Sequence, residues 1–258
     1  MTSNSKPVSR KSENTSTGES GTGRKVKPKP SSQPKETSSE SASRPGNKGR
    51  AIKPVQTRSV QRFELLLRAT DELLAEREPQ AVGIYDIAER AGVAPASVYH
   101  FFPSKEAAFL ALAERYLAEL AEVGAQAHDR SAMRNWPDLF EFAINRAVDF
   151  YNAHPVFRKL FLGGAVSAEI REREVAFNAR ISAGGYSWMQ RYFLMPYLAD
   201  PKMRFAVIWS IFDGICVTSQ VRYGQITEEF RAQALNAVVA YGRTFLPDVV
   251  LLRPPDEA

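Results

Sequence analysis

The sequence predicts an all-α protein of two helical domains, preceded by a disordered basic tail. From about residue 55 the apolar residues recur at helical spacing almost to the end of the chain, and no convincing strand or internal repeat interrupts them. A helix-turn-helix pattern occupies residues 84–102. The 258 residues suffice for two domains, which we place at 53–116 and 117–258 after a tail at 1–52.

The tail differs from the rest of the chain in charge and in apolar content. Residues 1–50 hold 11 Lys and Arg against 4 Asp and Glu, a net +7, so the remainder carries −2 of the overall +5. The segment has no aromatic residue and cannot bury enough apolar surface to offset its ordering entropy. Two interpretations of it stay open: a solubilising tail, or a loose electrostatic tether to DNA phosphates through the basic run at 25–30.

The first domain begins with a helix over about 55–77, whose apolar stripe is Phe63, Leu66, Leu67, Thr70, Leu73 and Leu74. Two short helices follow, with Gly92 at the sharp turn between them and Pro95 in the first turn of the second. Val98 and Phe101 are three residues apart and are expected to pack back on the first short helix. Ser104 is the predicted N-cap of a fourth helix that runs to about residue 126.

The second domain is predicted to contain five further helices. Asn135-Trp136-Pro137-Asp138 opens the first of them, and His154-Pro155 ends it and starts a short one. A longer helix is expected to be weakened or broken at Gly184-Gly185. The five predicted ranges are about 136–153, a short helix from 155, 166–195, 201–223 and 227–246.

The first domain combines a helix-turn-helix with a characteristic set of flanking residues: Arg62, Ala69, Leu73, Ile87-Ala88, Ala91-Gly92-Val93, Val98-Tyr99, Phe102 and Ser104-Lys105-Glu106. With these residues it resembles the N-terminal domain of the tetracycline-repressor (TetR) family over about residues 58–116, roughly a quarter of the chain. Two positions depart from the family pattern. Val82-Gly83 stands where a Ser or Thr often meets a phosphate, and Ala96-Ser97-Val98 replaces the usual Gly-Thr.

The resemblance implies that the second short helix enters a DNA major groove. Ala96 and Ser97 would then meet base edges, His100 a base or phosphate, and Tyr99 and Lys105 phosphates. Arg58 would reach the backbone or the minor groove, and the Tyr85 hydroxyl would replace the missing phosphate contact near residue 83. The alternatives are a Tyr99 packed on the first helix, a solvated Lys105 and a half-exposed His100. No outward Arg, Asn or Gln lies on this helix, so the operator sequence does not follow from it.

The last two helices are predicted to form a two-fold dimer interface. The segment 205–217 is apolar around most of its circumference and needs cover on all sides. A dimer would also supply two recognition helices about one DNA turn apart, ~34–36 Å. The predicted contacts are Ile215, Phe230, Ala234, Ala237, Val238 and Tyr241. The alternative is that both helices serve only their own core.

An apolar effector pocket is expected among the aromatic residues of the middle helices, as the resemblance implies. The candidate lining residues are Phe150, Phe157, Phe161, Trp188, Trp209, Phe212 and Asp213. Each aromatic residue has the alternative of simple core packing. Asp213, within an apolar helix, is expected either to face the effector or to pair with Arg180, Arg191 or Arg222.

Enzyme, metal and cofactor chemistry find no support in the sequence. His100, His128 and His154 share no ligand spacing, Cys216 has no catalytic histidine near it in sequence, and no Gly-rich phosphate loop follows a strand. The lone cysteine argues for a reducing compartment. The missing apolar leader argues against secretion, and the apolar stretches are too short and too broken to span a membrane. We therefore expect a cytoplasmic protein without a cofactor.

The function implied by the resemblance is a homodimeric transcriptional repressor that a largely apolar small molecule releases from a near-palindromic double-stranded operator. Two other hypotheses stay open. The first is a constitutive or architectural DNA-binding protein with a filled core, whose tail provides much of the affinity. The second is a small-molecule-binding or enzymatic helical domain that has kept a vestigial helix-turn-helix.

Overall fold

The computed structural model describes residues 50–51, 57–163 and 167–254, so the predicted tail lies almost entirely outside the described residues. The described part is helical, and its one β-bridge joins Phe193 and Leu252. It therefore confirms the predicted fold class. The first four α-helices are α1 (Thr57–Glu76), α2 (Ile84–Arg90), α3 (Pro95–Phe101) and α4 (Lys105–Ala125), with a 3-10 turn at Pro79–Ala81. The rest are α5 (Trp136–Ala153), α6 (Pro155–Phe161), α7 (Ala168–Gln190), α8 (Pro201–Tyr223) and α9 (Glu228–Gly242), with a second 3-10 turn at Arg130–Ala132.

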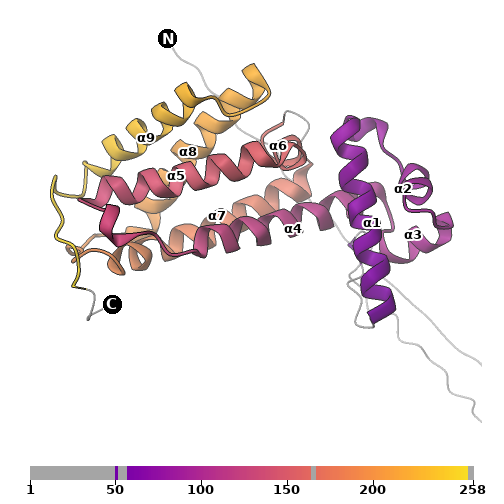
Figure 1. Ribbon diagram of the computed structural model, residues 1–258, viewed down its shortest axis with the longest axis horizontal. Coiled ribbons are helices and arrows are strands. Elements are labelled where there is room, and N and C mark those ends of the chain that lie inside the picture. The colour runs from indigo at the N-terminus through magenta and orange to yellow at the C-terminus, as the bar shows by residue number, and fades with distance from the viewer. Residues whose placement is uncertain (1–49, 52–56, 164–166, 255–258) are drawn as a thin grey trace, which may run out of the picture. The chain divides into compact units, whose positions relative to one another are not determined.

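Helices α1, α2 and α3 share one apolar core. Val98 and Phe102 are fully buried, and the Phe63 ring of α1 lies 5.2 Å from the Phe102 ring and 6.0 Å from the Phe101 ring. The Ser104 hydroxyl accepts a hydrogen bond from the Ala107 N–H, which confirms the predicted N-cap of α4. Helix α4 then extends from this group to α5 and α7 (Figure 1).

Helices α5, α7, α8 and α9 pack into a second group, in which α8 lies against both α7 and α9 (Figure 1). The Asn135 side chain caps α5 as it accepts the Trp136 N–H, and Asp138 accepts N–H bonds from Arg134 and Asn135. Helix α8 ends at Tyr223 and is capped by Gly224, whose φ of +71° is the left-handed conformation that glycine adopts without strain.

The predicted break at Gly184-Gly185 is wrong, because α7 runs through both residues to Gln190. The reason is a tertiary contact. A Cβ at position 185 would lie 2.3 Å from the Phe205 ring, so glycine allows α8 to approach α7 closely there. Helix α9 ends at Gly242, a few residues before the predicted stop at Phe245-Leu246-Pro247. Within the described ranges, no helix is long and apolar enough to cross a membrane.

Candidate DNA-binding surface and ligand cavity

The turn between α2 and α3 has the geometry that the sequence predicts. Gly92 has a φ of +64°, and the Val93 N–H donates to the Ala88 carbonyl across the turn at 3.0 Å. Ile87 and Ala88 are buried beneath α3, where a small residue permits a close crossing. This packing fixes α3 relative to α1 and leaves one face of α3 outside the core.

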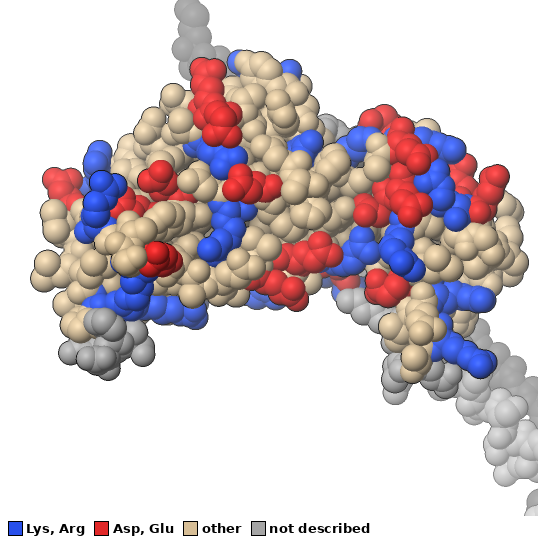
Figure 2. All heavy atoms as spheres, viewed as in Figure 1, with Lys and Arg blue, Asp and Glu red and all other residues tan. Residues whose placement is uncertain are grey.

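A groove between the N-terminal half of α1 and α3 gathers most of the predicted DNA contacts. The described residues that line it are Arg58, Ser59, Gln61, Arg62, Leu65, Ala96, Ser97, His100 and Phe101, and none of these is an Asp or Glu. Figure 2 shows Lys and Arg atoms at the lower right, over this end of α1, and mixed charges over its other end. The groove thus combines positive charge with short polar side chains, as phosphate binding requires.

Arg62 and Gln61 belong to this groove, although sequence reasoning did not select them as contacts. Their signal was available, because Arg58, Gln61 and Arg62 share one face of α1 at helical spacing. Tyr99 and Tyr85 lie outside the groove lining, with 47% and 69% of their surface exposed.

Lys105 makes a structural contact that the sequence did not predict, and its predicted phosphate contact stays a prediction. Its ammonium donates to the carbonyl oxygens of Pro79 and Gln80, at 3.4 and 3.3 Å, and thereby holds the turn before α2 against α4. An ammonium has three donors, so this arrangement leaves capacity for a phosphate.

Gly83 is the N-cap of α2, where the family pattern has a hydroxyl residue. Its N–H donates to the Asp86 carboxylate at 2.8 Å, and the Arg77 guanidinium lies 3.0 Å from the same carboxylate. The Gly83 N–H and the Arg77 side chain hold the pKa of Asp86 below its usual range. The start of α2 is thus capped without a hydroxyl.

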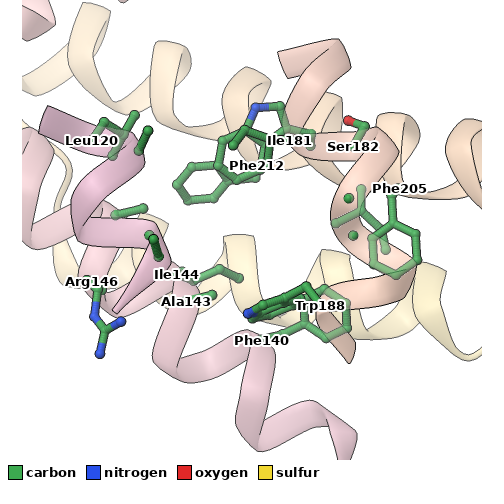
Figure 3. Close-up of a pocket in the computed structure, with 18 of the residues that line it drawn as sticks. Leu120, Phe140, Ala143, Ile144, Arg146, Ile181, Ser182, Trp188, Phe205 and Phe212 are labelled. Carbon is green, nitrogen blue, oxygen red and sulfur yellow. The ribbon is translucent and has the colours of Figure 1, made fainter. Parts of the chain in front are cut away.

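A cavity of about 330 Å³ lies between α4, α5, α7 and α8. Its walls are mainly apolar, and Figure 3 shows Leu120, Phe140, Ile144, Trp188 and Phe212 around it. The volume is at the lower end of the range for small-molecule sites.

The predicted pocket residues divide into two groups. Trp188, Trp209 and Phe212 line the cavity. Phe150, Phe157 and Phe161 do not, because they pack on one another in a separate aromatic cluster, with ring centroids 5.5 and 4.6 Å from Phe157. Phe157 and Phe161 belong to α6, which contacts α1 and α4.

Asp213 also lies outside the cavity lining, and no ion pair of the described residues joins it to Arg180, Arg191 or Arg222. It lies near the buried Glu174, which is ion-paired with Arg171. Burial raises the pKa of Asp213, and the Arg171 charge opposes that rise. Burial and the Asp213 carboxylate raise the pKa of Glu174 to about 7. Sequence reasoning missed Glu174 because its helix carries many exposed charges.

The polar groups on the cavity wall are His128, Ser182 and three arginines, Arg146, Arg180 and Arg191. His128 is buried, and burial together with the Arg146 charge lowers its pKa, so its imidazole is neutral near pH 7. Sequence reasoning did not assign these residues to a pocket. They lie on three different segments, and no local pattern brings such segments together.

The predicted dimer residues divide into buried and half-buried ones. Ala234 and Val238 are buried within their own chain, and Val238 lines the cavity, so neither is free to meet a second subunit. Ile215, Phe230 and Tyr241 are half-buried against the core, and Ala237 is half-buried as well. Met203 and Val221 of α8 are exposed.

The part of the chain that the structure describes holds no group of three or more His, Cys, Asp or Glu side chains able to bind a metal ion. The one cysteine, Cys216, is buried, and burial raises the pKa of its thiol. A thiol in this state is a poor nucleophile.

Comparisons with known proteins agree with this architecture. Residues 66–112 match the family described as bacterial regulatory proteins, tetR family. A tetR-family transcriptional regulator from Streptomyces coelicolor superposes with a TM-score of 0.57 at 20% identity, over 71% of this chain and 81% of that chain. A transcriptional regulator from Rhodococcus sp. RHA1 gives 0.54 at 18%, over 71% and 97%. SmeT, the repressor of the Stenotrophomonas maltophilia multidrug efflux pump SmeDEF, gives 0.52 at 17%, over 72% and 91%.

At these identities the solved structures show a shared fold, and no curated protein sequence matches the chain. The helix-turn-helix domain carries the likeness: its residues 66–112 match the tetR family of bacterial regulatory proteins.

Proposed function

We propose that this protein is a ligand-responsive transcriptional repressor that acts as a homodimer on a near-palindromic operator in the cytoplasm, without enzymatic activity. The observation that carries the proposal is the course of α4. Its first residue, Lys105, holds the turn before α2, and its last turns, including Leu120 and Val123, line the cavity. One helix therefore contacts both the helix-turn-helix and the candidate effector site.

The proposed mechanism follows from this arrangement. A helix of 21 residues spans about 30 Å, so a small tilt at its cavity end becomes a displacement at Lys105. An effector that binds the tilted arrangement more tightly than the DNA-bound one shifts the population away from DNA. A difference of a few kcal/mol between the effector's binding free energies for the two arrangements suffices.

The dimer is proposed on the outer faces of α8 and α9. Ile215, Phe230, Ala237 and Tyr241 supply half-buried apolar surface, and Gly214 of α8 faces open space, which permits a close helix approach. Two such pairs of helices would form a four-helix interface around a two-fold axis. A Gly214→Arg variant is expected to be monomeric in analytical ultracentrifugation.

The proposal is tested by a gel shift against DNA from the upstream intergenic region, at physiological salt with excess competitor DNA. Wild type is compared with the pair Tyr99→Ala and Lys105→Ala, and with a chain that starts at residue 51. The matched control is Tyr197→Ala with Lys202→Ala, two exposed residues far from α3 in sequence. A discrete complex that only the Tyr99 and Lys105 variant loses supports the proposal.

Binding that disappears with residues 1–50 and shows no preferred site would instead indicate an architectural protein held by its tail. Retained ligand binding without DNA binding in any state would indicate a vestigial helix-turn-helix.

A further inference from the structure

The charged residues around the cavity are of one sign. Arg146, Arg180 and Arg191 contribute to its lining, and none of the described residues that line it is an Asp or Glu. None of the three takes part in an ion pair within the described residues, whereas Arg171 and Arg173, on the same helix as Arg180, both do. The cavity thus carries positive charge that no carboxylate of the described residues pairs with.

Arg146 is held in place by carbonyl groups instead of a carboxylate. Its guanidinium donates to the Val123, Gln126 and Ala127 carbonyl oxygens at 3.3, 2.8 and 3.4 Å, and Figure 3 shows it at the rim of the cavity. Hydrogen bonds to carbonyls satisfy its donors and leave its net charge in place. Arg180 and Arg191 are exposed at the edge, and Arg180 lies over the Phe177 ring at 5.5 Å.

Ser182 is the second observation that points to a ligand. It is 6% exposed, it lines the cavity, and its hydroxyl has no hydrogen-bond partner among the described residues. Figure 3 shows it on the same side of the cavity as Phe205. Buried hydroxyls without a partner are uncommon, because burial removes the hydrogen bonds that water would make. A ligand atom in the cavity would supply the missing partner.

We infer that the cavity takes an amphipathic carboxylate with an aromatic body and a hydrogen-bonding atom on that body. The rings would lie between Trp188, Trp209 and Phe212, the carboxylate would meet the arginines at the rim, and the hydrogen-bonding atom would reach the Ser182 hydroxyl. This assignment rests on the proposed function, since it makes the cavity the effector site.

The test uses three probes with one ring system: 2-naphthoate, 2-naphthamide and 2-naphthylmethylammonium. Their dissociation constants are measured with the full chain by calorimetry and by quenching of tryptophan fluorescence, because Trp188 and Trp209 line the cavity. We expect the carboxylate to bind about tenfold more tightly than the amide, and the cation most weakly. The variant Arg180→Gln with Arg191→Gln should lose this preference for the carboxylate and keep its affinity for the amide.

The matched control is Arg68→Gln with Arg222→Gln, two exposed arginines outside the lining, and it should bind like wild type. A fourth probe, 6-hydroxy-2-naphthoate, should bind more tightly than 2-naphthoate, and Ser182→Ala should remove that gain alone. Equal affinities for carboxylate and amide, or no binding of any probe, would overturn the assignment. If the protein binds operator DNA but does not prefer the carboxylate probe, the proposed ligand class is wrong and the proposed function stands. If it binds 2-naphthoate but no DNA, the proposed function is wrong and the ligand class stands.

Discussion

The hydroxyl of Tyr116 on α4 donates a hydrogen bond of 2.6 Å to the Asp71 carboxylate on α1. Tyr116 is buried, and burial together with the Asp71 carboxylate raises the pKa of its phenol, so it remains a donor at every physiological pH. Arg115 lies 3.4 Å from the same carboxylate. These contacts join the helix-turn-helix core to the helix whose far end lines the cavity.

Replacement of Tyr116 by Phe should lower the free energy of unfolding by about 1–2 kcal/mol, because a hydrogen bond to a charged acceptor is lost while the ring packing remains. Urea unfolding followed by circular dichroism measures this. Tyr223→Phe is the control, since the Tyr223 hydroxyl has no hydrogen-bond partner among the described residues. Equal losses in the two variants would show that the contact to Asp71 contributes nothing.

Arg58 and Arg62 are expected to bind phosphates rather than bases. Each alanine variant should weaken binding to specific and nonspecific DNA alike, and should reduce the slope of log K against log salt by about 1. Fluorescence anisotropy at several salt concentrations gives this slope. Arg68→Ala on the same helix is the control, because Arg68 is exposed but does not line the groove. A slope that stays at the wild-type value in both groove variants would remove them from the DNA interface.

The sequence predicts the helix-turn-helix well because its signals are local. Gly92 needs the left-handed conformation, Pro95 suits a helix start, and Val98 faces inward by helical spacing, all within ten residues. Helices α8 and α9 lack such signals. An apolar stripe on a helix does not show whether it meets its own core or a second chain, and so Ala234 and Val238 of α9 were predicted to be dimer contacts although they are buried within their own chain.

The cavity could be predicted only in part for a related reason. Aromatic residues indicate apolar surroundings, but whether a ring lines an empty space or fills the core depends on neighbouring helices. Trp188 and Phe157 are both aromatic residues of the middle helices, but Trp188 lines the cavity and Phe157 packs in the separate aromatic cluster. The unpartnered hydroxyl of Ser182 arises only from tertiary packing, which no local pattern encodes.

Gly184 and Gly185 allow a matched test of the contact between α7 and α8. Gly185→Ala should destabilise the protein by about 1–3 kcal/mol, because a new Cβ would lie 2.3 Å from the Phe205 ring. Gly184→Ala should stabilise it by up to about 1 kcal/mol, because its Cβ would meet nothing within 4 Å and alanine favours the helix. Thermal unfolding measures the stability of both variants, and a Gly185→Ala variant more stable than wild type would contradict the close packing of α7 and α8.

Glu174 should make stability fall as the pH rises toward neutrality. Its pKa is raised from 4.5 to about 7 by burial and by Asp213, against the opposing Arg171 charge. Between these two values the folded chain holds a proton that the unfolded chain has released, so stability is greater on the acid side and is lost as the pH passes through about 7. One such group contributes a slope of at most about 1.4 kcal/mol per pH unit.

Glu174→Gln should remove this contribution, so its stability relative to wild type should rise steadily between about pH 5 and pH 7 and level off above. Urea unfolding of both proteins across this range measures the difference. The comparison must be differential, because His128 acts in the opposite direction: burial and Arg146 lower its pKa, and the unfolded chain then binds the extra proton. That term is common to both proteins and cancels. A difference that does not change with pH would mean that Glu174 is ionised in the folded protein throughout, held by its ion pair with Arg171.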